Sequence, residues 1–430
     1  ELFTETLFDG LGRPVKVTKS GPSATQAIIV DTGWDGRGNK ASETVPRYAP
    51  STGIRTRTFQ FDALARPIAV IEPDGATTTT AYGLSPEARG VVAVTVTDPN
   101  GTIAVTHADA FGRDIRRDRI LDATHTATTR ITRDVSGRVT GIVDPIGAVW
   151  SNSWDSLGRR LSATDPDLGT WTYTYDAAGR LKTQTDSRGN LVALAYDNLG
   201  RLLTRTVTPS GGTAEVTRSV WDENRVGTTN LGRLSREVNA VARVCRNHDL
   251  AGRVIWERWT LPSATTRCDL DPVGSENFTF TTGYDSGGRV VTRGWPDGDV
   301  TGTAASPMKY DMAGRLKSIP GAVSAFTYDA SGHTSKAVYA NGVTTTFGYD
   351  VYRGWMTSIE HAEAGTAFET KSYQHDPGGR ITSITSSTPG ESWTYQYDAL
   401  DRLTNATNLD DAARSQYFRY DLGSRFTYAR

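Results

Sequence analysis

One short phrase recurs along this sequence: an aromatic residue or histidine, then Asp, two variable residues, Gly and Arg. Clear copies begin at Phe8, Trp154, Tyr175, Tyr196, His248, Tyr284, Tyr310 and His375. Looser copies place the aspartate at Asp35, Asp62, Asp109, Asp134, Asp222, Asp329, Asp350, Asp398 and Asp421. The basic period is 21 residues with insertions, and a decayed copy is expected at Tyr82-Gly83. Because the repeat covers almost the whole chain, it constrains the fold more than any other feature.

The repeated phrase predicts a tight turn. A first-position Asp accepts nearby backbone N–H groups in a type I turn, and Gly at the fourth position supplies the left-handed conformation that closes a hairpin. Arg after the turn can also pair with an Asp of an adjacent repeat, as a weak surface interaction. We assign structural turn roles to Asp155, Gly158, Arg159, Asp176, Gly179, Arg180, Asp197, Gly200, Arg201, Asp285, Gly288, Arg289, Asp311, Gly314 and Arg315.

A second turn lies about halfway along most repeats. Examples are Asp98-Pro99-Asn100-Gly101 and Asp144-Pro145-Ile146-Gly147, in which Pro presets the turn and Gly closes it. Between turns the residues alternate, as in Trp171-Thr172-Tyr173, and are rich in Thr, Val, Tyr and Trp, which is typical of strands. No helical periodicity is sustained. The sequence therefore predicts an all-β protein in which each unit contributes two short strands.

About 18 units imply roughly 36 strands in a long antiparallel meander. Open twisted sheets rarely exceed about 10 strands without curling or splitting, so the meander is expected to coil. A spiral ribbon around a hollow is favoured over propeller blades, which usually repeat at about 40 residues or more. We expect one repeat array over residues 1–430, with insertion loops near 40–56 and 256–278.

Composition excludes several other classes of protein. The formal net charge of -1 argues against nucleic-acid binding, and no apolar run reaches the roughly 20 residues of a membrane span. The 39 aromatic residues argue against disorder, and two cysteines cannot form a disulfide framework. The chain begins at Glu1 without a basic and apolar leader, so we expect it to be an internal piece of a longer protein.

Few residues outside the repeat are candidates for chemistry. Cys245 and Cys268 are about one repeat apart, which allows a disulfide between neighbouring hairpins, two buried thiols, or, with His248, a zinc site. Two further groups of oxygen ligands are weak candidates for a cation site: Asp31, Asp35 and Asn39, and Asp269, Asp271 and Glu276. The turns explain the repeated Asp and Arg residues without catalysis. No catalytic residues, metal or cofactor are therefore assigned.

The Tyr-Asp-x-x-Gly-Arg phrase, with Asp-Pro-x-Gly turns between its copies, resembles the YD/RHS repeat family over about residues 8–425. That family includes bacterial polymorphic toxins, the B and C subunits of insecticidal toxin complexes, and teneurin ectodomains. The resemblance implies a spiral β-sheet that winds into a hollow shell, which encloses a toxic polypeptide in the toxin members. Those members end in a self-cleaving core segment. The present sequence stops at Tyr420-Asp421 and the few residues after it, so self-cleavage and cargo cannot be transferred.

Two functions follow from this resemblance and from the residues. The first is structural: a segment of a secreted shell that encloses or presents a toxin or other polypeptide, with that polypeptide or the flanking segments of its own chain as partner. The second is an extracellular adhesion module, in which loops such as Pro46–Gly53 or the aromatic stripe bind a carbohydrate or protein receptor. Nothing in the sequence favours an enzyme.

Overall fold

The computed structural model describes residues 2–85, 90–223, 225, 229–261, 268 and 276–429. These residues form β-strands and one 3-10 helix, η1 (Ala412–Arg414), with no α-helix among them. The all-β prediction is therefore confirmed. No helix in this part of the chain is long and apolar enough to cross a membrane.

The residues cluster into two compact units. Unit 1 comprises Glu1–Ile131, Val143–Ala148 and Lys309–Arg430, and unit 2 comprises Thr132–Ile142 and Val149–Met308. Unit 1 contains two ribbons of strands, which we call the N-terminal ribbon (residues 2–131 with 143–148) and the C-terminal ribbon (residues 309–429). Strands β12 and β13 have residues in both units.

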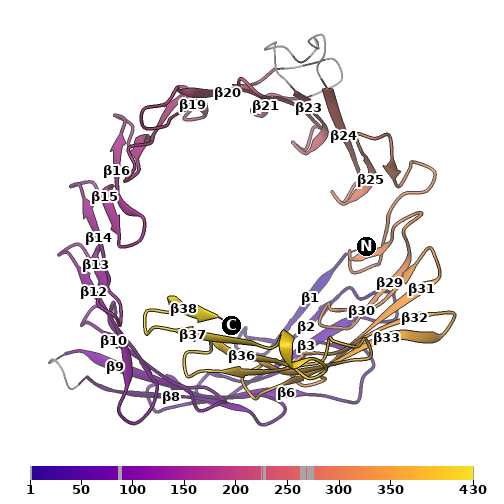
Figure 1. Cartoon of the computed structure of the whole chain (residues 1–430). Helices are drawn as coiled ribbons and strands as arrows, with labels where there is room; N and C mark the ends of the chain where they lie inside the picture. The colour runs from indigo at the N-terminus through magenta and orange to yellow at the C-terminus, as the bar shows by residue number, and fades with distance from the viewer. Residues whose placement is uncertain are drawn as a thin grey trace. The chain divides into compact units, whose positions relative to one another are not determined.

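The N-terminal ribbon is an antiparallel meander in which successive strands pair (Figure 1). Its strands are β1 (Thr4–Phe8), β2 (Pro14–Lys19), β3 (Ile28–Trp34), β4 (Lys40–Thr44), β5 (Arg47–Tyr48), β6 (Thr56–Phe61), β7 (Pro67–Ile71), β8 (Thr77–Leu84), β9 (Val92–Thr97), β10 (Ile103–Ala108), β11 (Asp114–Ile120), β12 (Thr126–Arg133) and β13 (Val139–Val143). Among the described strands of this ribbon, the order of pairing changes near residues 40–56, where an insertion was expected. Here β5 folds back to pair with β3, while β4 pairs directly with β6.

The C-terminal ribbon is a second meander of the same kind. Its strands are β27 (Lys309–Tyr310), β28 (Leu316–Ser318), β29 (Val323–Tyr328), β30 (Thr334–Tyr339), β31 (Val343–Tyr349), β32 (Met356–Glu363), β33 (Thr366–His375), β34 (Ile381–Ser386), β35 (Trp393–Tyr397), β36 (Leu403–Asn408), β37 (Gln416–Tyr420) and β38 (Phe426–Ala429). The longest strands, β32 and β33, extend past the usual hairpin length and form a projecting pair.

Unit 2 continues the pattern, with antiparallel pairing between neighbours from β14 to β26. Its strands are β14 (Val149–Trp154), β15 (Arg160–Asp165), β16 (Gly169–Tyr175), β17 (Leu181–Thr185), β18 (Leu191–Tyr196), β19 (Leu202–Thr208), β20 (Glu215–Trp221), β21 (Leu234–Val238), β22 (Arg243–His248), β23 (Val254–Leu261), β24 (Glu276–Tyr284), β25 (Val290–Gly294) and β26 (Val300–Thr301). Much of the second expected insertion, near residues 256–278, lies outside the described residues.

The strands have few buried apolar side chains. Among the described residues only eleven hydrophobic ones are buried, and several of these are alanines. The largest fully buried side chains are instead Arg243, Asn230 and Thr260, all in unit 2. In β16, Trp171, Tyr173 and Tyr175 are half-buried on one face while the threonines between them are exposed. The sheet therefore depends on contacts between neighbouring repeats more than on a central apolar core.

Candidate functional site: interlocked turns

Each repeat contains a turn built around one aspartate, and the turn at Asp176 is representative. The N–H of Gly179 donates to the carbonyl oxygen of Asp176 at 2.9 Å, and the Asp176 N–H donates to the carbonyl of Arg180 at 2.9 Å. One carboxylate oxygen of Asp176 accepts the N–H groups of Ala178 and Arg180, and the other accepts Nε of Arg180 at 2.7 Å. Gly179 has φ +81°, which other L-residues adopt only with strain.

The hydrogen bonds of the turn also set its electrostatics. The backbone N–H of Arg180 lowers the pKa of Asp176 below the ordinary value of 3.8, and the guanidinium of the same residue adds to this effect against the cost of desolvation. The carboxylate is therefore held in its charged form, as a stable acceptor. Asp155, Asp197 and Asp285 have lowered pKa values for the same reason.

The arginine of each turn also contacts the next repeat. Nη1 of Arg180 donates to the carbonyl oxygen of Asp197 at 3.0 Å, and the guanidinium lies 4.8 Å from the ring centroid of Tyr196. The hydroxyl of Tyr196 in turn donates to the carbonyl of Leu181, directly after the arginine, at 2.9 Å. We call this set of contacts the Arg–aromatic latch, because it joins one hairpin to the following one.

The latch recurs in both units. The guanidinium lies 4.2 to 5.4 Å from the aromatic ring centroid in the pairs Arg13–Trp34, Arg66–Tyr82, Arg159–Tyr175, Arg201–Trp221, Arg253–Tyr284, Arg315–Tyr328, Arg380–Tyr397 and Arg402–Tyr420. Tyr82 takes part through its hydroxyl as well, which donates to Pro67, so the decayed copy expected at Tyr82-Gly83 keeps this part of the repeat.

The arginines have a second role besides the pairing with an adjacent repeat that the sequence allowed. Most of these guanidinia bind the carboxylate of their own turn. Among the described turn arginines, Arg201 also binds Asp222 and Arg380 also binds Asp401 of the following repeat, each at 2.8 Å. The planar guanidinium can bind its own aspartate through one side and still reach the next repeat with Nη1, which a lysine ammonium could not do.

The structure places the predicted turn residues at turns of this kind. The glycines have φ between +79° and +83°, at positions Gly158, Gly179, Gly200, Gly288 and Gly314. In the looser copies of the repeat, another residue takes the place of one turn residue. The glycine position is occupied by Ala65, Asp401 and Ser424, with φ of 60°, 62° and 65°. At Asp329 the arginine is replaced by His333, whose Nδ1 contacts the carboxylate at 2.8 Å. How much each turn residue contributes to stability stays a prediction.

Within unit 1 the two ribbons meet through their turns. Hairpin turns of a meander alternate between two edges, so each ribbon has an Asp-Arg edge, which carries the repeated Asp-x-x-Gly-Arg turns, and a mid-turn edge, which carries the turns between them. Nη1 of Arg353, from the turn at Asp350, contacts the carboxylate of Asp74 at 3.2 Å. The N–H of Gly378 donates to Oδ1 of Asn100 at 2.9 Å. The Asp-Arg edge of the C-terminal ribbon therefore lies on the mid-turn edge of the N-terminal ribbon.

Six turns of one ribbon match six segments of the other in order. Hydrogen bonds join Met312 to Pro22, Asp329 to Tyr48, Arg353 to Asp74, Gly378 to Asn100 and Asp401 to Arg119, and a Cβ added at Gly423 would lie 2.8 Å from Oδ2 of Asp144. The hydrogen bonds that join Tyr48 to Tyr328 and Asp329, Arg353 to Asp74, Gly378 to Asn100, and Arg119 to Asp401 connect partners 278 to 282 residues apart. The docking is therefore in register, one hairpin to one hairpin.

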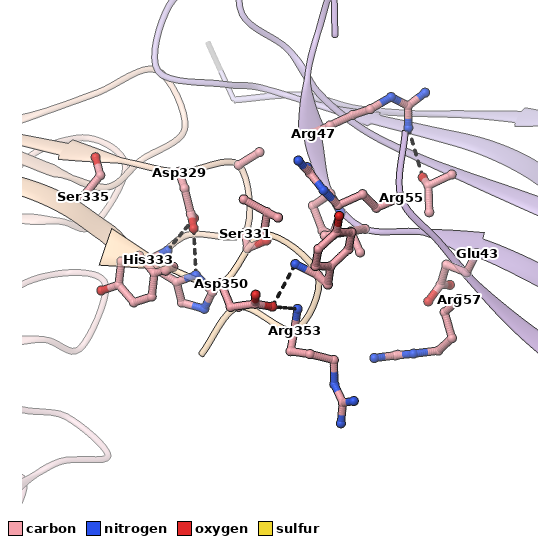
Figure 2. Close-up of a pocket in the computed structure, with 18 of the residues that line it drawn as sticks. Glu43, Arg47, Arg55, Arg57, Asp329, Ser331, His333, Ser335, Asp350 and Arg353 are labelled. Atoms are coloured by element: carbon pink, nitrogen blue, oxygen red, sulfur yellow. Dashed lines mark hydrogen bonds and ion pairs between the residues drawn. The ribbon is translucent and has the colours of Figure 1, made fainter. Parts of the chain in front are cut away.

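A polar pocket of about 550 Å³ lies at one of these junctions. Figure 2 shows Arg47, Arg55 and Arg57 of the N-terminal ribbon on one side, and the turns at Asp329 and Asp350 of the C-terminal ribbon on the other. Most of the charges are paired: Arg47 with Asp31, Arg57 with Glu72, and Arg353 with Asp74. Beside the pocket, the Tyr48 hydroxyl donates to the carbonyls of Tyr328 and Asp329, each at 2.9 Å. Tyr48, in the segment near residues 40–56, thus connects the N-terminal ribbon to the C-terminal ribbon.

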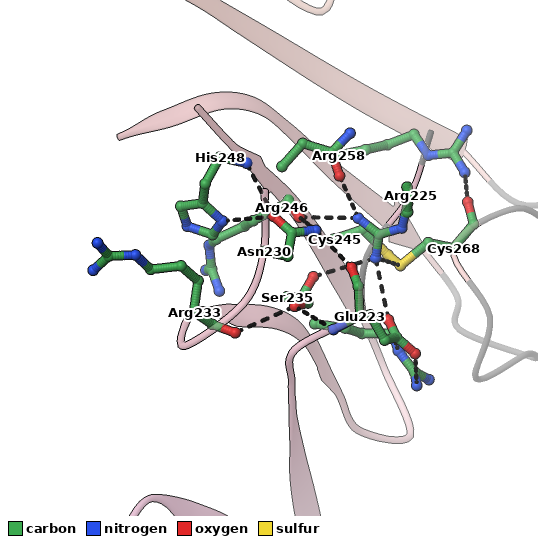
Figure 3. A network of polar contacts seen from close by, with 12 residues as sticks. Glu223, Arg225, Asn230, Arg233, Ser235, Cys245, Arg246, His248, Arg258 and Cys268 are labelled. Atoms are coloured by element: carbon green, nitrogen blue, oxygen red, sulfur yellow. Dashed lines mark hydrogen bonds and ion pairs between the residues drawn. A yellow bond between two sulfur atoms is a disulfide. The ribbon is translucent and has the colours of Figure 1, made fainter. Parts of the chain in front are cut away.

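A buried polar network in unit 2 surrounds a disulfide (Figure 3). Cys245 and Cys268 are joined, with Cα atoms 6.0 Å apart. Arg225 contacts the sulfur of Cys268 at 2.9 Å and donates to the carbonyl of Arg246 at 2.9 Å. Burial lowers the pKa of Arg225 despite the neighbouring carboxylate of Glu223. These hydrogen bonds satisfy polar groups that apolar packing would leave unpaired, which explains how so many can be buried here.

The cation sites considered from the sequence are not assembled in the described residues, where no cluster of metal-ligating side chains occurs. The sulfurs of Cys245 and Cys268 are in the disulfide, so they cannot act as zinc thiolates, and His248 instead contacts Asn230 at 2.9 Å. Asp35 and Asn39 belong to an ordinary turn, and Asp31 pairs with Arg47. Asp269 and Asp271 lie outside the described residues.

Sequence reasoning missed one hydrogen-bonded row, Ser85, His107 and Asp118. His107 contacts Ser85 at 3.0 Å through Nδ1 and Asp118 at 3.0 Å through Nε2. Burial raises the pKa of Asp118, but hydrogen bonds from Arg116, Thr128 and His107 outweigh it and hold the pKa below the usual value. All three residues of the row are buried. Because Asp118 also binds Arg116 and Thr128, these side-chain contacts link strands β10, β11 and β12.

Comparison with known proteins agrees with this geometry. The RHS Repeat family matches residues 133–170, 175–213 and 375–413. No curated protein sequence gives a significant match. Among solved structures, the crystal structure of TcdB2-TccC3-TEV matches at 17% identity over 99% of this chain, with a TM-score of 0.83. The crystal structure of TcdB2-TccC3 matches at 18% identity over 99%, with the same TM-score.

The structure of the Photorhabdus luminescens Tc holotoxin pore is similar to the whole chain at 17% identity and a TM-score of 0.83. In each case the match covers 26% of the other chain, so this chain spans about a quarter of the length of the chains it resembles. Identity at this level shows a shared fold. The resemblance to the YD/RHS repeat family expected from the sequence is thereby confirmed, with RHS Repeat matches in these three segments of the chain.

Proposed function

We propose that this chain is a wall segment of a secreted, toxin-associated RHS protein, and that the wall encloses or presents another polypeptide. The observation that supports this proposal most directly is the Arg–aromatic latch, which joins successive hairpins in both units without a central apolar core. Repeats that are stable through their neighbours can extend into a long wall. The likeness to the TcdB2-TccC3 and Tc holotoxin structures supports a role in such an assembly.

The chemistry of the turn residues favours a structural role over an enzymatic one. Their charged groups are committed to fixed hydrogen bonds, as in Asp176 with Arg180, and hydrogen bonds from Arg180 lower the pKa of Asp176, which favours its charged form. A general acid or base needs a pKa near the working pH, and these carboxylates are shifted away from it.

The proposal can be tested on the complete natural polypeptide that contains these residues. We expect its non-repeat segment to resist proteinase K while the repeats are folded, and to be digested once they are unfolded. The same segment expressed alone is the control, and it should be digested rapidly. Equal digestion rates for the segment alone and within the complete polypeptide would contradict enclosure and leave presentation as the remaining form of the proposal.

Binding of a receptor is a second candidate, favoured by one aromatic patch in unit 2. A shallow pocket of about 390 Å³ is lined by Trp259, Phe278, Phe280 and Arg293, with Glu257 beside them. Trp295 packs edge-on against Phe280 at 6.3 Å between centroids. Exposed aromatic faces next to a carboxylate and a guanidinium suit a sugar ring, because the rings stack on it while the charged groups bind hydroxyls.

Glycan-array binding of this chain tests that candidate. A Trp259→Ala variant should lose at least tenfold in affinity for any glycan bound, whereas Trp171→Ala, on an aromatic strand outside the patch, should bind as the original chain does. If no glycan binds, or if both variants bind equally, the patch is not a carbohydrate site.

A further inference from the structure

One arginine in the polar pocket of unit 1 has no partner for its charge. The pocket has a volume of about 550 Å³ and is lined by residues of both ribbons (Figure 2). Three of its four arginines are in ion pairs, with Asp31, Glu72 and Asp74. The guanidinium of Arg55, in contrast, forms no hydrogen bond or ion pair with any residue that the structure describes. Its N–H donors are therefore free to bind a ligand.

Neighbouring groups nevertheless hold Arg55 in place. The guanidinium lies 5.6 Å from the ring centroid of Tyr352, which belongs to the opposite ribbon. The N–H of Val45 donates to the carbonyl oxygen of Arg55 at 2.8 Å, which fixes the backbone. A planar guanidinium that lies over a ring keeps its N–H groups at its edge, where two of them can bind both oxygens of a carboxylate.

The pocket also contains a carboxylate that no arginine side chain binds. At most turns the arginine pairs with its own aspartate, but Arg353 of the turn at Asp350 binds Asp74 instead. One carboxylate oxygen of Asp350 accepts the N–H groups of Tyr352 and Arg353, at 2.9 and 2.7 Å. Among the described residues, none binds its other oxygen. Asp350 can therefore accept a hydrogen bond from a hydroxyl group of a ligand.

The walls of the pocket come from strands inside each ribbon. One wall is formed by β4, β6 and the segment between them, and the other by β30, β31 and the turns at Asp329 and Asp350. Further strands pair with both walls on either side: β3 and β7 in the N-terminal ribbon, and β29 and β32 in the C-terminal ribbon. The site is therefore built from paired strands and not from the outermost strand of either ribbon.

These groups together favour one class of ligand. A carboxylate would pair with Arg55, and hydroxyl groups would bind Asp350 and Ser331, which both line the pocket. A phosphate dianion fits less well, because the carboxylates of Asp329 and Asp350 would repel its second charge. A neutral sugar would leave Arg55 unpaired. The volume lies in the range of roughly 300–1,000 Å³ that is usual for small-molecule sites.

We propose that this pocket binds an acidic monosaccharide such as a uronic acid, with the carboxylate on Arg55 and the hydroxyl groups on Asp350 and Ser331. The sugar can be free or the terminal residue of a glycan. Since both ribbons line the pocket, a bound sugar contacts both and stabilises their junction. The site shares no residue with the aromatic patch around Trp259, and its failure would leave the wall function standing.

Isothermal titration calorimetry with a small set of ligands tests the site. Glucuronate should bind. Glucose and glucose 6-phosphate should each bind at least tenfold more weakly, because the first lacks the charge and the second carries an extra one. An oligosaccharide with a terminal glucuronate distinguishes the two sources: it should bind as glucuronate does if the pocket takes the end of a glycan, and not at all if it takes only the free sugar.

Two arginine variants test the assigned contact. Arg55→Gln should lose at least tenfold in affinity for glucuronate, whereas Arg37→Gln, at an exposed position of the same ribbon outside the pocket, should bind as the original chain does. Because the Arg55 side chain bonds to none of the described residues, the fold should persist, and circular dichroism checks that it does. In the original chain, glucuronate should slow amide exchange at the turns of Asp329 and Asp350.

Four outcomes would overturn the proposal. The first three are an absence of glucuronate binding, equal binding of glucose, and an Arg55→Gln variant that binds as the original chain does. The fourth is binding by this chain but not by the complete natural polypeptide, because another part of that polypeptide would then occupy the pocket.

Discussion

Nη1 of Arg180 donates a hydrogen bond of 3.0 Å to the carbonyl oxygen of Asp197, the first residue of the next repeat's turn. The same guanidinium binds its own aspartate and lies against the ring of Tyr196. One side chain thus closes its own turn and positions the following hairpin. The stability of any repeat is therefore linked to that of its neighbour.

Arg180→Lys should weaken this link. Lysine keeps the charge but cannot reach the aspartate, the next carbonyl and the ring together, so we expect the local opening free energy to fall by about 1 kcal/mol. Hydrogen exchange of amides in β17 and β18 should then accelerate about fivefold. Arg188→Lys, at an exposed turn position, serves as the control and should leave exchange unchanged.

Gly179→Val should cost about 1 to 3 kcal/mol, because valine adopts a φ of +81° only with strain. An added Cβ would meet no atom closer than 3.9 Å, so the cost arises in the backbone and not from a clash. Gly179→Asn should be milder, since Asn tolerates this region. Ala178→Val is the control. Equal melting temperatures for the Gly179→Val and Ala178→Val variants would contradict the turn assignment.

Tyr48→Phe should loosen the junction between the ribbons of unit 1. The hydroxyl donates to Tyr328 and Asp329 and contacts Nη2 of Arg315 at 3.2 Å, and phenylalanine removes all three interactions. Amide exchange around the turn at Asp329 should rise severalfold. Tyr82→Phe removes a similar hydroxyl bond within one ribbon and should leave that turn unaffected. Indistinguishable exchange in the two variants would argue against the junction.

Acid should destabilise the fold through the turn aspartates. Their pKa values are lowered in the folded chain, as for Asp155 and Asp197, so their stabilising effect is present above the unfolded value near 4. It is lost progressively as the pH falls below about 4 and the carboxylates take up protons. Melting temperatures measured from pH 6 to pH 2 should drop in that lower range. A melting temperature that is level from pH 5 to pH 2 would rule this out.

Replacing Cys245 and Cys268 together by Ala should destabilise unit 2 by about 3 kcal/mol, because the disulfide closes a loop of 23 residues in the unfolded chain. In the unreduced, unfolded protein no thiol should react with a maleimide, and two should react after reduction. Two reactive thiols without a reductant would show that the disulfide is absent in solution.

The hairpin turns could be predicted from the sequence because their cause is local. Asp176 and Gly179 act within four residues, and the residue types alone indicate the turn. The latch was missed, although several copies carry its signal: an aromatic residue lies 16 positions after the arginine, as Tyr196 does after Arg180. Recognising it requires knowing that both residues share one face of adjacent hairpins.

The junction between the ribbons could not be predicted from local patterns. The position of Asn100 opposite Gly378 depends on the summed length of every strand and turn between them, and small errors accumulate over 278 residues. The buried polar residues of unit 2, such as Arg243 and Asn230, were also missed. Their types are usually exposed, and their burial depends on hydrogen bonds that no local pattern indicates: Arg243 donates to Thr260, and Asn230 donates to the carbonyl of Glu223 in the network around Arg225.

The in-register docking of the ribbons implies a rule for how such a chain tolerates length changes. Within unit 1, each docked turn of the C-terminal ribbon meets one hairpin of the N-terminal ribbon, so the partners are matched hairpin by hairpin. Extra residues within one edge loop of either ribbon should therefore leave the other partnerships intact. Insertion of one whole hairpin into the C-terminal ribbon before Arg353 would instead bring a different turn to Asp74, so that Arg353 and Asp74 would no longer meet.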